Sequence, residues 1–94
     1  MNEWTATGEI FYLKELSGEF GASVKIKGTS QREGCFSTQV LELPCLLTTK
    51  AYEDAKAKKI AVYKTVTFAG HIETWVNKER KKNMFIADYI VEVA

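Results

Sequence analysis

The chain has 94 residues, of which 46% are hydrophobic, and its formal net charge is +1. This length provides for one domain around one core, and the apolar runs are too short to cross a membrane. The first residues lack the basic segment and apolar stretch of a signal peptide. We therefore expect a single cytoplasmic domain over residues 1–94, and the near-neutral charge neither indicates nor excludes a nucleic-acid partner.

Three strands are predicted in the first half of the chain. The first covers Trp4–Leu16, with a bulge at Gly8. The second covers Ala22–Gly28, where apolar and polar residues alternate as they do along a half-buried strand. The third covers Cys35–Leu43 and is expected to end at Pro44, because proline cannot donate a hydrogen bond to the next strand.

A helix is predicted over Lys50–Lys59, which is rich in Ala and Lys. Thr48 or Thr49 is a suitable cap for its N-terminus, and Glu53 and Asp54 are favourable in its first turn.

The clearest alternation lies over Ile60–Val76 and predicts a half-buried fourth strand that bends at Gly70. Asn83–Val93 is rich in β-branched and aromatic residues and is expected to form the last strand. A helix between the third and fourth of five strands is the arrangement of the OB-fold. The predicted fold is therefore all-β, a five-stranded OB-fold (Greek-key) barrel with one short α-helix between strands 3 and 4.

Basic residues are concentrated in one part of the chain. Residues 50–82 contain nine Lys/Arg and four Asp/Glu, whereas residues 1–49 contain four and six. The predicted loop Asn77–Asn83 joins strands four and five and holds Lys78, Arg80, Lys81 and Lys82. A solvated surface accounts for this pattern. A single-stranded nucleic acid accounts for it as well, because its phosphates need cations and its bases need flat side chains on which to stack.

Two predicted strands place further side chains of this kind on one face. Lys25 and Lys27 lie on the polar side of the second strand, and His71 and Trp75 share one side of the fourth. Three roles are open for Trp75: base stacking, partial burial, or a subunit interface, where tryptophan is favoured. His71 has neither a nucleophile nor a metal ligand beside it in sequence, so we expect a contact residue rather than a catalytic base.

Metal and disulfide chemistry are not expected. Cys35 and Cys45 lie in or beside one predicted strand, where ten residues of extended chain place them roughly 33 Å apart at most, far beyond disulfide reach. Two cysteines and one histidine without ligand spacing predict no zinc site. Because no catalytic constellation or glycine-rich phosphate loop is present either, we predict a binding protein without cofactor rather than an enzyme.

Several motifs resemble bacterial single-stranded DNA-binding proteins. Val66–Trp75 (VTFAGHIETW) is similar to that family's fourth strand, in which a hydrophobic-x-hydrophobic-x-Gly-x-Leu-x-Thr pattern leads into a tryptophan-bearing hairpin. Gly8-Glu9-Ile10 resembles the end of its first strand, and Gly21-Ala22-Ser23-Val24 resembles the start of its second. Phe36 falls where the third strand begins, and Asp88-Tyr89-Ile90-Val91 where the last ends. The similarity covers nearly the whole chain in the right order.

The resemblance implies a replication, repair or recombination accessory that binds single-stranded DNA without strong sequence preference, as a homodimer or homotetramer. It implies stacking by Phe36 and Trp75, backbone contacts by Lys25 and Lys27, and a Lys78–Lys82 loop that grips the DNA. The candidate nucleic-acid-binding residues are Lys25, Lys27, Phe36, His71, Trp75, Lys78, Arg80, Lys81 and Lys82.

The chain also departs from the family. Glu42 stands where a second aromatic of the third strand is expected, and the acidic C-terminal tail is missing after Val93-Ala94. The chain therefore resembles a divergent or minimal relative. Two hypotheses remain open: a binder of single-stranded DNA, with RNA as an alternative ligand, or an OB-fold interaction or oligomerisation module whose exposed aromatics contact protein.

Overall fold

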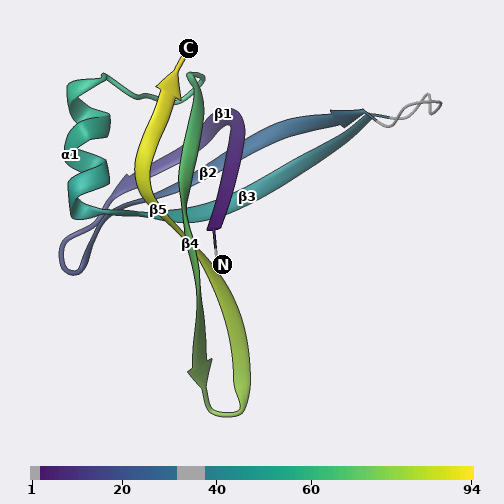
Figure 1. The fold of residues 1–94 in the computed structure, drawn as a ribbon, viewed down its shortest axis with the longest axis vertical. Helices are drawn as coiled ribbons and strands as arrows, with labels where there is room; N and C mark the ends of the chain where they lie inside the picture. The colour runs from purple at the N-terminus through teal and green to yellow at the C-terminus, as the bar shows by residue number, and fades with distance from the viewer. Residues whose placement is uncertain (1–2, 32–37) are drawn as a thin grey trace.

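The computed structural model describes residues 3–31 and 38–94, over which five strands and one helix are formed (Figure 1). In chain order they are β1 (Glu3–Glu15), β2 (Phe20–Gln31), β3 (Thr38–Thr48), α1 (Thr49–Ala57), β4 (Thr65–Asn77) and β5 (Arg80–Val93).

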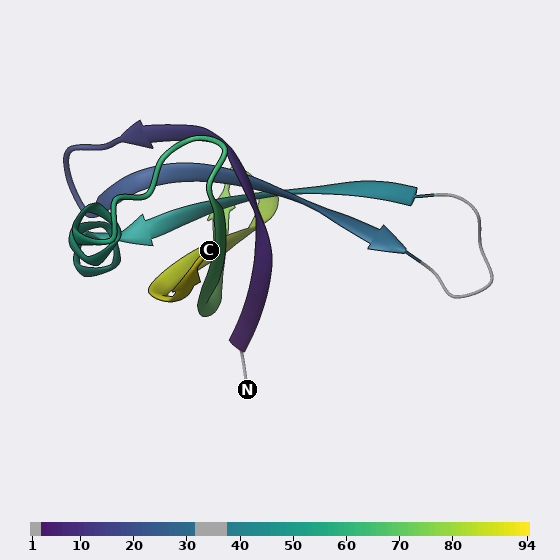
Figure 2. The same ribbon diagram turned by 90° about the horizontal axis from the view of Figure 1, so that it is seen from above.

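The strands close into a barrel in the order β1-β2-β3-β5-β4. β1 is shared between two neighbours, because Glu3–Glu9 pairs with β4 and Glu9–Glu15 pairs with β2. β3 meets β5 in parallel at Leu46 and Leu47, and the other pairings are antiparallel. Figure 2 shows α1 on one side of the barrel and the β2–β3 hairpin extending from the other. The five-stranded OB-type barrel with its helix between the third and fourth strands is confirmed.

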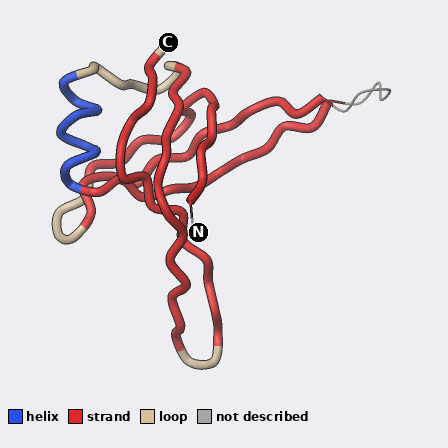
Figure 3. Tube along the Cα trace, viewed as in Figure 1, coloured by secondary structure: helices blue, strands red, loops and turns tan. Residues whose placement is uncertain are grey.

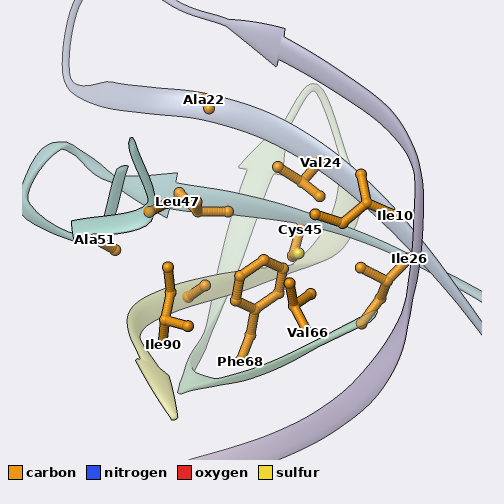
Figure 4. Packing of buried hydrophobic residues seen from close by; sticks show 12 residues of the cluster. Ile10, Ala22, Val24, Ile26, Cys45, Leu47, Ala51, Val66, Phe68 and Ile90 are labelled. Atoms are coloured by element: carbon orange, nitrogen blue, oxygen red, sulfur yellow. The ribbon is translucent and has the colours of Figure 1, made fainter. Parts of the chain in front are cut away.

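The core lies inside the barrel, and the buried residues that the structure describes are all apolar (Figure 4). Phe68 of β4 is fully buried among side chains from β1, β2 and β3 such as Ile10, Val24 and Leu47. The helix adds Ala51 and Ala55 to the same cluster. Small residues at these two positions let the helix approach the barrel closely, which is how α1 covers one side of the core.

The helix differs from its prediction in its ends. Thr48 is the N-cap, and its side-chain oxygen accepts a hydrogen bond from the backbone N–H of Ala51 at 3.1 Å. Glu53 and Asp54 therefore lie after the first turn instead of within it. The helix ends at Ala57 and not at Lys59, whose φ of 57° is left-handed and incompatible with a further helical turn.

The third strand continues to Thr48, so its predicted end at Leu43 is wrong; its predicted start at Cys35 lies outside the described residues. Pro44 lies within the strand, opposite Lys25 of β2. β3 pairs with β5 only from Leu46 onward, so before that point one of its edges has no strand partner among the described residues. Proline is compatible with such an edge, because no ladder hydrogen bond is required there.

The fourth strand begins at Thr65, five residues after the predicted start at Ile60. Tyr63 has a φ of 77°, which an extended strand does not allow. The backbone turns here, with Lys64 N–H bonded to the Ala61 carbonyl at 3.1 Å and Tyr63 N–H to the Ile10 carbonyl at 2.8 Å. The apolar alternation before Thr65 therefore belongs to a loop.

Glycine positions mark close backbone approaches. The β4–β5 register shifts between Ala69 and Gly70, as the sequence predicted, and a Cβ at Gly70 would collide with the Ile86 carbonyl oxygen of β5. The bulge predicted at Gly8 lies further along β1, between Ile10 and Tyr12.

The β4–β5 hairpin projects well beyond the barrel (Figures 1 and 3). Its turn contains only Lys78 and Glu79, with φ values of 46° and 70°, between the paired residues Asn77 and Arg80. Positive φ at both positions matches the twist of a two-residue hairpin. The predicted loop Asn77–Asn83 is therefore mostly strand. Within the part of the chain that the structure describes, no helix is long and apolar enough to span a membrane.

Candidate nucleic-acid interface

The β4–β5 hairpin gathers the sequence-predicted aromatic and basic residues at one place. Trp75 lies opposite Lys82, and Asn77 lies opposite Arg80. Directly opposed residues of an antiparallel pair share a face, and so do residues two apart along each strand. Together with Lys81, these four residues line a cavity of about 440 Å³. The ladder register thus places Arg80 and Lys82 on the same face as the indole, and Lys81, which lies opposite Val76, contributes to the lining of the cavity as well.

Trp75 is held from two sides. Its ring lies 5.9 Å from the Phe20 ring, centroid to centroid, at an angle of 38°. Its indole Nε1–H donates a hydrogen bond to Glu73 Oε1 at 3.0 Å. The residue remains 40% exposed. Of the three roles open for Trp75, burial is therefore only partial, and enough of the indole is accessible to contact a ligand.

Lys25 and Lys27 lie on β2 and are not part of the hairpin cavity. The Lys25 ammonium is 5.0 Å from the centre of the Tyr12 ring, and the Lys27 ammonium is 5.7 Å from that of Phe11. Cations over ring faces at these distances are attracted by the quadrupole of the ring. They form a second group of cations and rings on β1 and β2.

The sequence analysis did not find Phe11 and Tyr12 as neighbours of the lysines. Their placement depends on the β1–β2 register, which shifts between Ile10 and Tyr12. A single-residue slip exchanges the two faces of a strand, so no sequence pattern along β1 alone predicts which residue faces Lys27. Lys27 also lies opposite Glu42 of β3, the carboxylate that stands where the family resemblance expects an aromatic.

Two further residues of the predicted nucleic-acid-binding set belong to neither of these groups. Lys78 lies in the hairpin turn and is exposed. Phe36 lies outside the described residues.

His71 is engaged by carboxylates. Its Nδ1 lies 2.6 Å from Asp88 Oδ2 of β5, and its Nε2 lies 2.7 Å from Glu73 Oε2 of its own strand. The hydrogen bond to Asp88, followed by that to Glu73, raises the pKa of His71 above its ordinary 6.5. The pKa of Glu73 is lowered, first by the hydrogen bond from Trp75 and then by that of His71.

A second cavity, of about 290 Å³, lies beside this histidine on the outer side of β1, β4 and β5. Its lining includes Glu3, Trp4, His71, Asp88 and Tyr89. Over residues 3–31 and 38–94, no group of three or more histidine, cysteine or acidic residues is arranged to hold a metal ion.

No protein-family model matches the sequence, and no curated protein sequence matches it. Solved structures do resemble it. A small single-stranded DNA-binding protein from Mycoplasma pneumoniae superposes with a TM-score of 0.70 at 21% identity, covering 98% of this chain and 93% of that one. A Plasmodium falciparum SSB in complex with ssDNA superposes with a TM-score of 0.64 at 14% identity, covering 95% and 88%. The chain therefore has the SSB-like OB-fold that the sequence motifs predicted.

Proposed function

We propose that this domain binds single-stranded DNA on the β4–β5 hairpin, through Trp75 and the cations beside it. The observation that carries the proposal is the cavity where Trp75 meets Arg80, Lys81 and Lys82. An unpaired base stacks on an aromatic face, and the phosphates on either side of it are attracted by basic side chains. Stacking and phosphate attraction do not depend on which base is present, so the binding is without strong sequence preference. Such binding would serve DNA replication, repair or recombination.

The fold supports the same proposal. The Plasmodium falciparum neighbour is an SSB seen with ssDNA, and the Mycoplasma pneumoniae neighbour is a small single-stranded DNA-binding protein. We extend their ligand to this chain because the hairpin of this chain carries the stacking and charged groups that such a ligand requires.

Exposed apolar residues favour a second proposal, assembly into a homodimer or homotetramer. Val76, Tyr89 and Val91 are 67%, 58% and 54% exposed, and all three lie on β4 or β5. Large apolar side chains on a sheet surface are typical of subunit contacts. Light scattering coupled to size exclusion tests this directly: a mass of two or four chains is expected, and a strict monomer contradicts it.

Binding is tested with a fluorescently labelled oligo(dT) by anisotropy, at low and moderate salt. The wild-type protein should bind, and its affinity should fall as salt rises, because phosphate contacts release counterions. Absence of binding at low salt overturns the proposal. An oligo(U) competitor shows whether RNA binds equally well.

Two variants that lose the same number of positive charges test whether the DNA binds at the hairpin or elsewhere on the domain. The first, Arg80→Gln/Lys81→Gln/Lys82→Gln, neutralises the hairpin. The control, Lys56→Gln/Lys59→Gln/Lys64→Gln, neutralises three exposed lysines in the last turn of α1 and in the segment that joins α1 to β4, at the opposite end of the barrel from the hairpin (Figure 1). The hairpin variant should reduce the slope of log K against log salt by about 2, from roughly 0.7 per phosphate contact. Equal losses in the two variants contradict the site.

A further inference from the structure

Four side chains form a continuous hydrogen-bonded chain from the barrel to the hairpin. Asp88 of β5 contacts His71 at 2.6 Å, His71 contacts Glu73 at 2.7 Å, and Glu73 accepts the indole N–H of Trp75 at 3.0 Å. The last member is the tryptophan of the proposed DNA site. The histidine at its centre is therefore two hydrogen bonds away from the aromatic ring that contacts the ligand.

We propose that His71 and Glu73 are positioning residues that orient the Trp75 indole, and that protonation of His71 regulates the affinity for single-stranded DNA. The regulatory part of this inference rests on the proposed function, whereas the orientation of Trp75 is a property of the free protein.

The chain is complete only when His71 is charged. An imidazolium ion has two N–H donors, one for Asp88 and one for Glu73, whereas a neutral imidazole has one donor and one acceptor. Loss of the proton therefore leaves one of the two carboxylates without its donor. It also removes the positive charge that offsets the carboxylates, close to the ring on which a base stacks.

The groups around His71 reinforce this direction. Asp88 and Tyr89 of β5 line the cavity beside it, Glu73 follows on its own strand, and Glu3 of β1 is its partner in the ladder. The ionised neighbours among these are carboxylates, which favour the charged form of the histidine. Accordingly the pKa of His71 is raised, first by the Asp88 hydrogen bond, and deprotonation occurs above the ordinary histidine value of 6.5.

Deprotonation of His71 should change the affinity for DNA in one direction only. Above the pKa of His71, the imidazolium charge that offsets the carboxylates is lost, so the cluster repels the phosphates more strongly. The neutral ring has one N–H for its two carboxylate partners, which loosens the hydrogen-bonded chain that fixes Glu73 and, through it, Trp75. Affinity for DNA should therefore fall as pH rises through the pKa of His71. For a phosphate bound about 8 Å from the imidazole in a largely aqueous setting, loss of the imidazolium charge corresponds to about a two- to threefold change in affinity at low salt.

The orientation of Trp75 is tested without DNA, by NMR. The indole N–H resonance of Trp75, assigned with Trp75→Phe, is followed together with the His71 ring protons as pH is raised. Both should titrate with one midpoint above 6.5, and in His71→Gln the indole should no longer titrate. A Trp75 resonance that is insensitive to pH, or one that still titrates in His71→Gln, overturns the positioning role.

Regulation is tested by oligo(dT) anisotropy across the same pH range. The wild-type affinity should fall about two- to threefold, and His71→Gln should show no such dependence. Glu73→Gln keeps an oxygen acceptor for the indole but removes the charge, so it should bind at high pH at least as well as the wild type does at low pH. Glu53→Gln on α1 removes one exposed charge elsewhere and should retain the wild-type profile.

The two failures are distinguishable. If no DNA binds at any pH, the proposed function is wrong, and the NMR titration still decides the positioning role. If DNA binds with a pH dependence that persists in His71→Gln, the regulatory inference is wrong and the proposed function stands.

Discussion

The rings of Phe20 and Trp75 lie 5.9 Å apart although β2 and β4, which carry them, are separated by β1 in the barrel. Phe20 is the first residue of β2, and Trp75 lies near the far end of β4. The contact therefore connects the projecting β4–β5 hairpin to the beginning of the second strand. Together with the hydrogen bond to Glu73, it gives Trp75 a defined position instead of a free one at a hairpin surface.

Removing the Trp75 ring should weaken oligo(dT) binding. Trp75→Ala loses a stacking surface worth about 1–3 kcal/mol, so a loss of about tenfold is expected, while Trp75→Phe keeps a ring and loses less. Anisotropy measures the affinities, and urea unfolding confirms that the variants are folded. Tyr63→Ala is the matched control, because Tyr63 is 80% exposed in the loop before β4. Equal losses in Trp75→Ala and Tyr63→Ala would argue against stacking on Trp75.

Gly70→Ala should destabilise the barrel. Its Cβ would collide with the Ile86 carbonyl oxygen and approach Asp88 N at 2.8 Å, and both belong to the backbone of β5. Overpacking of this kind costs about 1–3 kcal/mol or more, measured as a lower midpoint of urea unfolding. Gly28→Ala serves for comparison, since its Cβ meets the Thr7 carbonyl oxygen at 3.1 Å. A Gly70 variant as stable as the Gly28 variant would contradict the close approach.

The thiol of Cys45 should be unreactive in the folded protein. Burial raises its pKa to about 12, so almost no thiolate is present at mildly alkaline pH, and the thiolate is the nucleophile. In Cys35→Ser, Cys45 is the remaining thiol of the chain. It should react slowly with a disulfide reagent under native conditions and rapidly in urea. Rapid native reaction would contradict its burial.

The hairpin turn should be improved by residues suited to left-handed backbone. Lys78 and Glu79 both have positive φ, which Asn-Gly adopts with less strain. Lys78→Asn/Glu79→Gly should raise the free energy of unfolding by about 1 kcal/mol, as measured in urea, because left-handed backbone costs most other residues roughly 1–2 kcal/mol each. Lys78→Gln/Glu79→Gln removes the same charges without relieving the backbone and should have little effect. If both variants are equally stable, relief of the left-handed backbone is not what changes the stability.

Stability should depend on pH through His71. Its pKa is higher in the folded than in the unfolded chain, so its stabilising contribution is complete below the unfolded value of about 6.5 and disappears as pH rises through the raised folded value. Glu73, whose pKa is lowered, contributes above its unfolded pKa and loses its effect as pH falls through the lowered folded value.

The stabilisation by this pair should therefore be greatest between the two unfolded pKa values, and it should decline on the alkaline side as pH rises from the unfolded pKa of His71 through the raised folded one. Thermal unfolding measures it, and His71→Gln should remove the alkaline decline. The effect should be small because the side chains are about two-fifths exposed. A wild-type decline that is unchanged in His71→Gln would assign it to other groups.

Most of the barrel could be predicted because strand and helix patterns are local. Val24 and Ile26, or Val66 and Phe68, alternate with polar residues, and a chain with that period must bury one face. The predicted strand ends were wrong where tertiary contacts or an unusual backbone angle override the local sequence pattern. Pro44 is accommodated because one edge of β3 has no strand partner among the described residues at that point, and Tyr63 ends an apolar alternation through a left-handed backbone angle.

Composition and periodicity by themselves determined an OB-type barrel with a basic, tryptophan-bearing segment between its last two strands. They did so because burial period, charge and aromatic content are properties of single segments. Only the tertiary structure decided that Trp75 shares a cavity with Arg80, Lys81 and Lys82, and that His71 joins Asp88 to Glu73. Those relations depend on strand register, and a shift of one residue reverses every side chain of a strand.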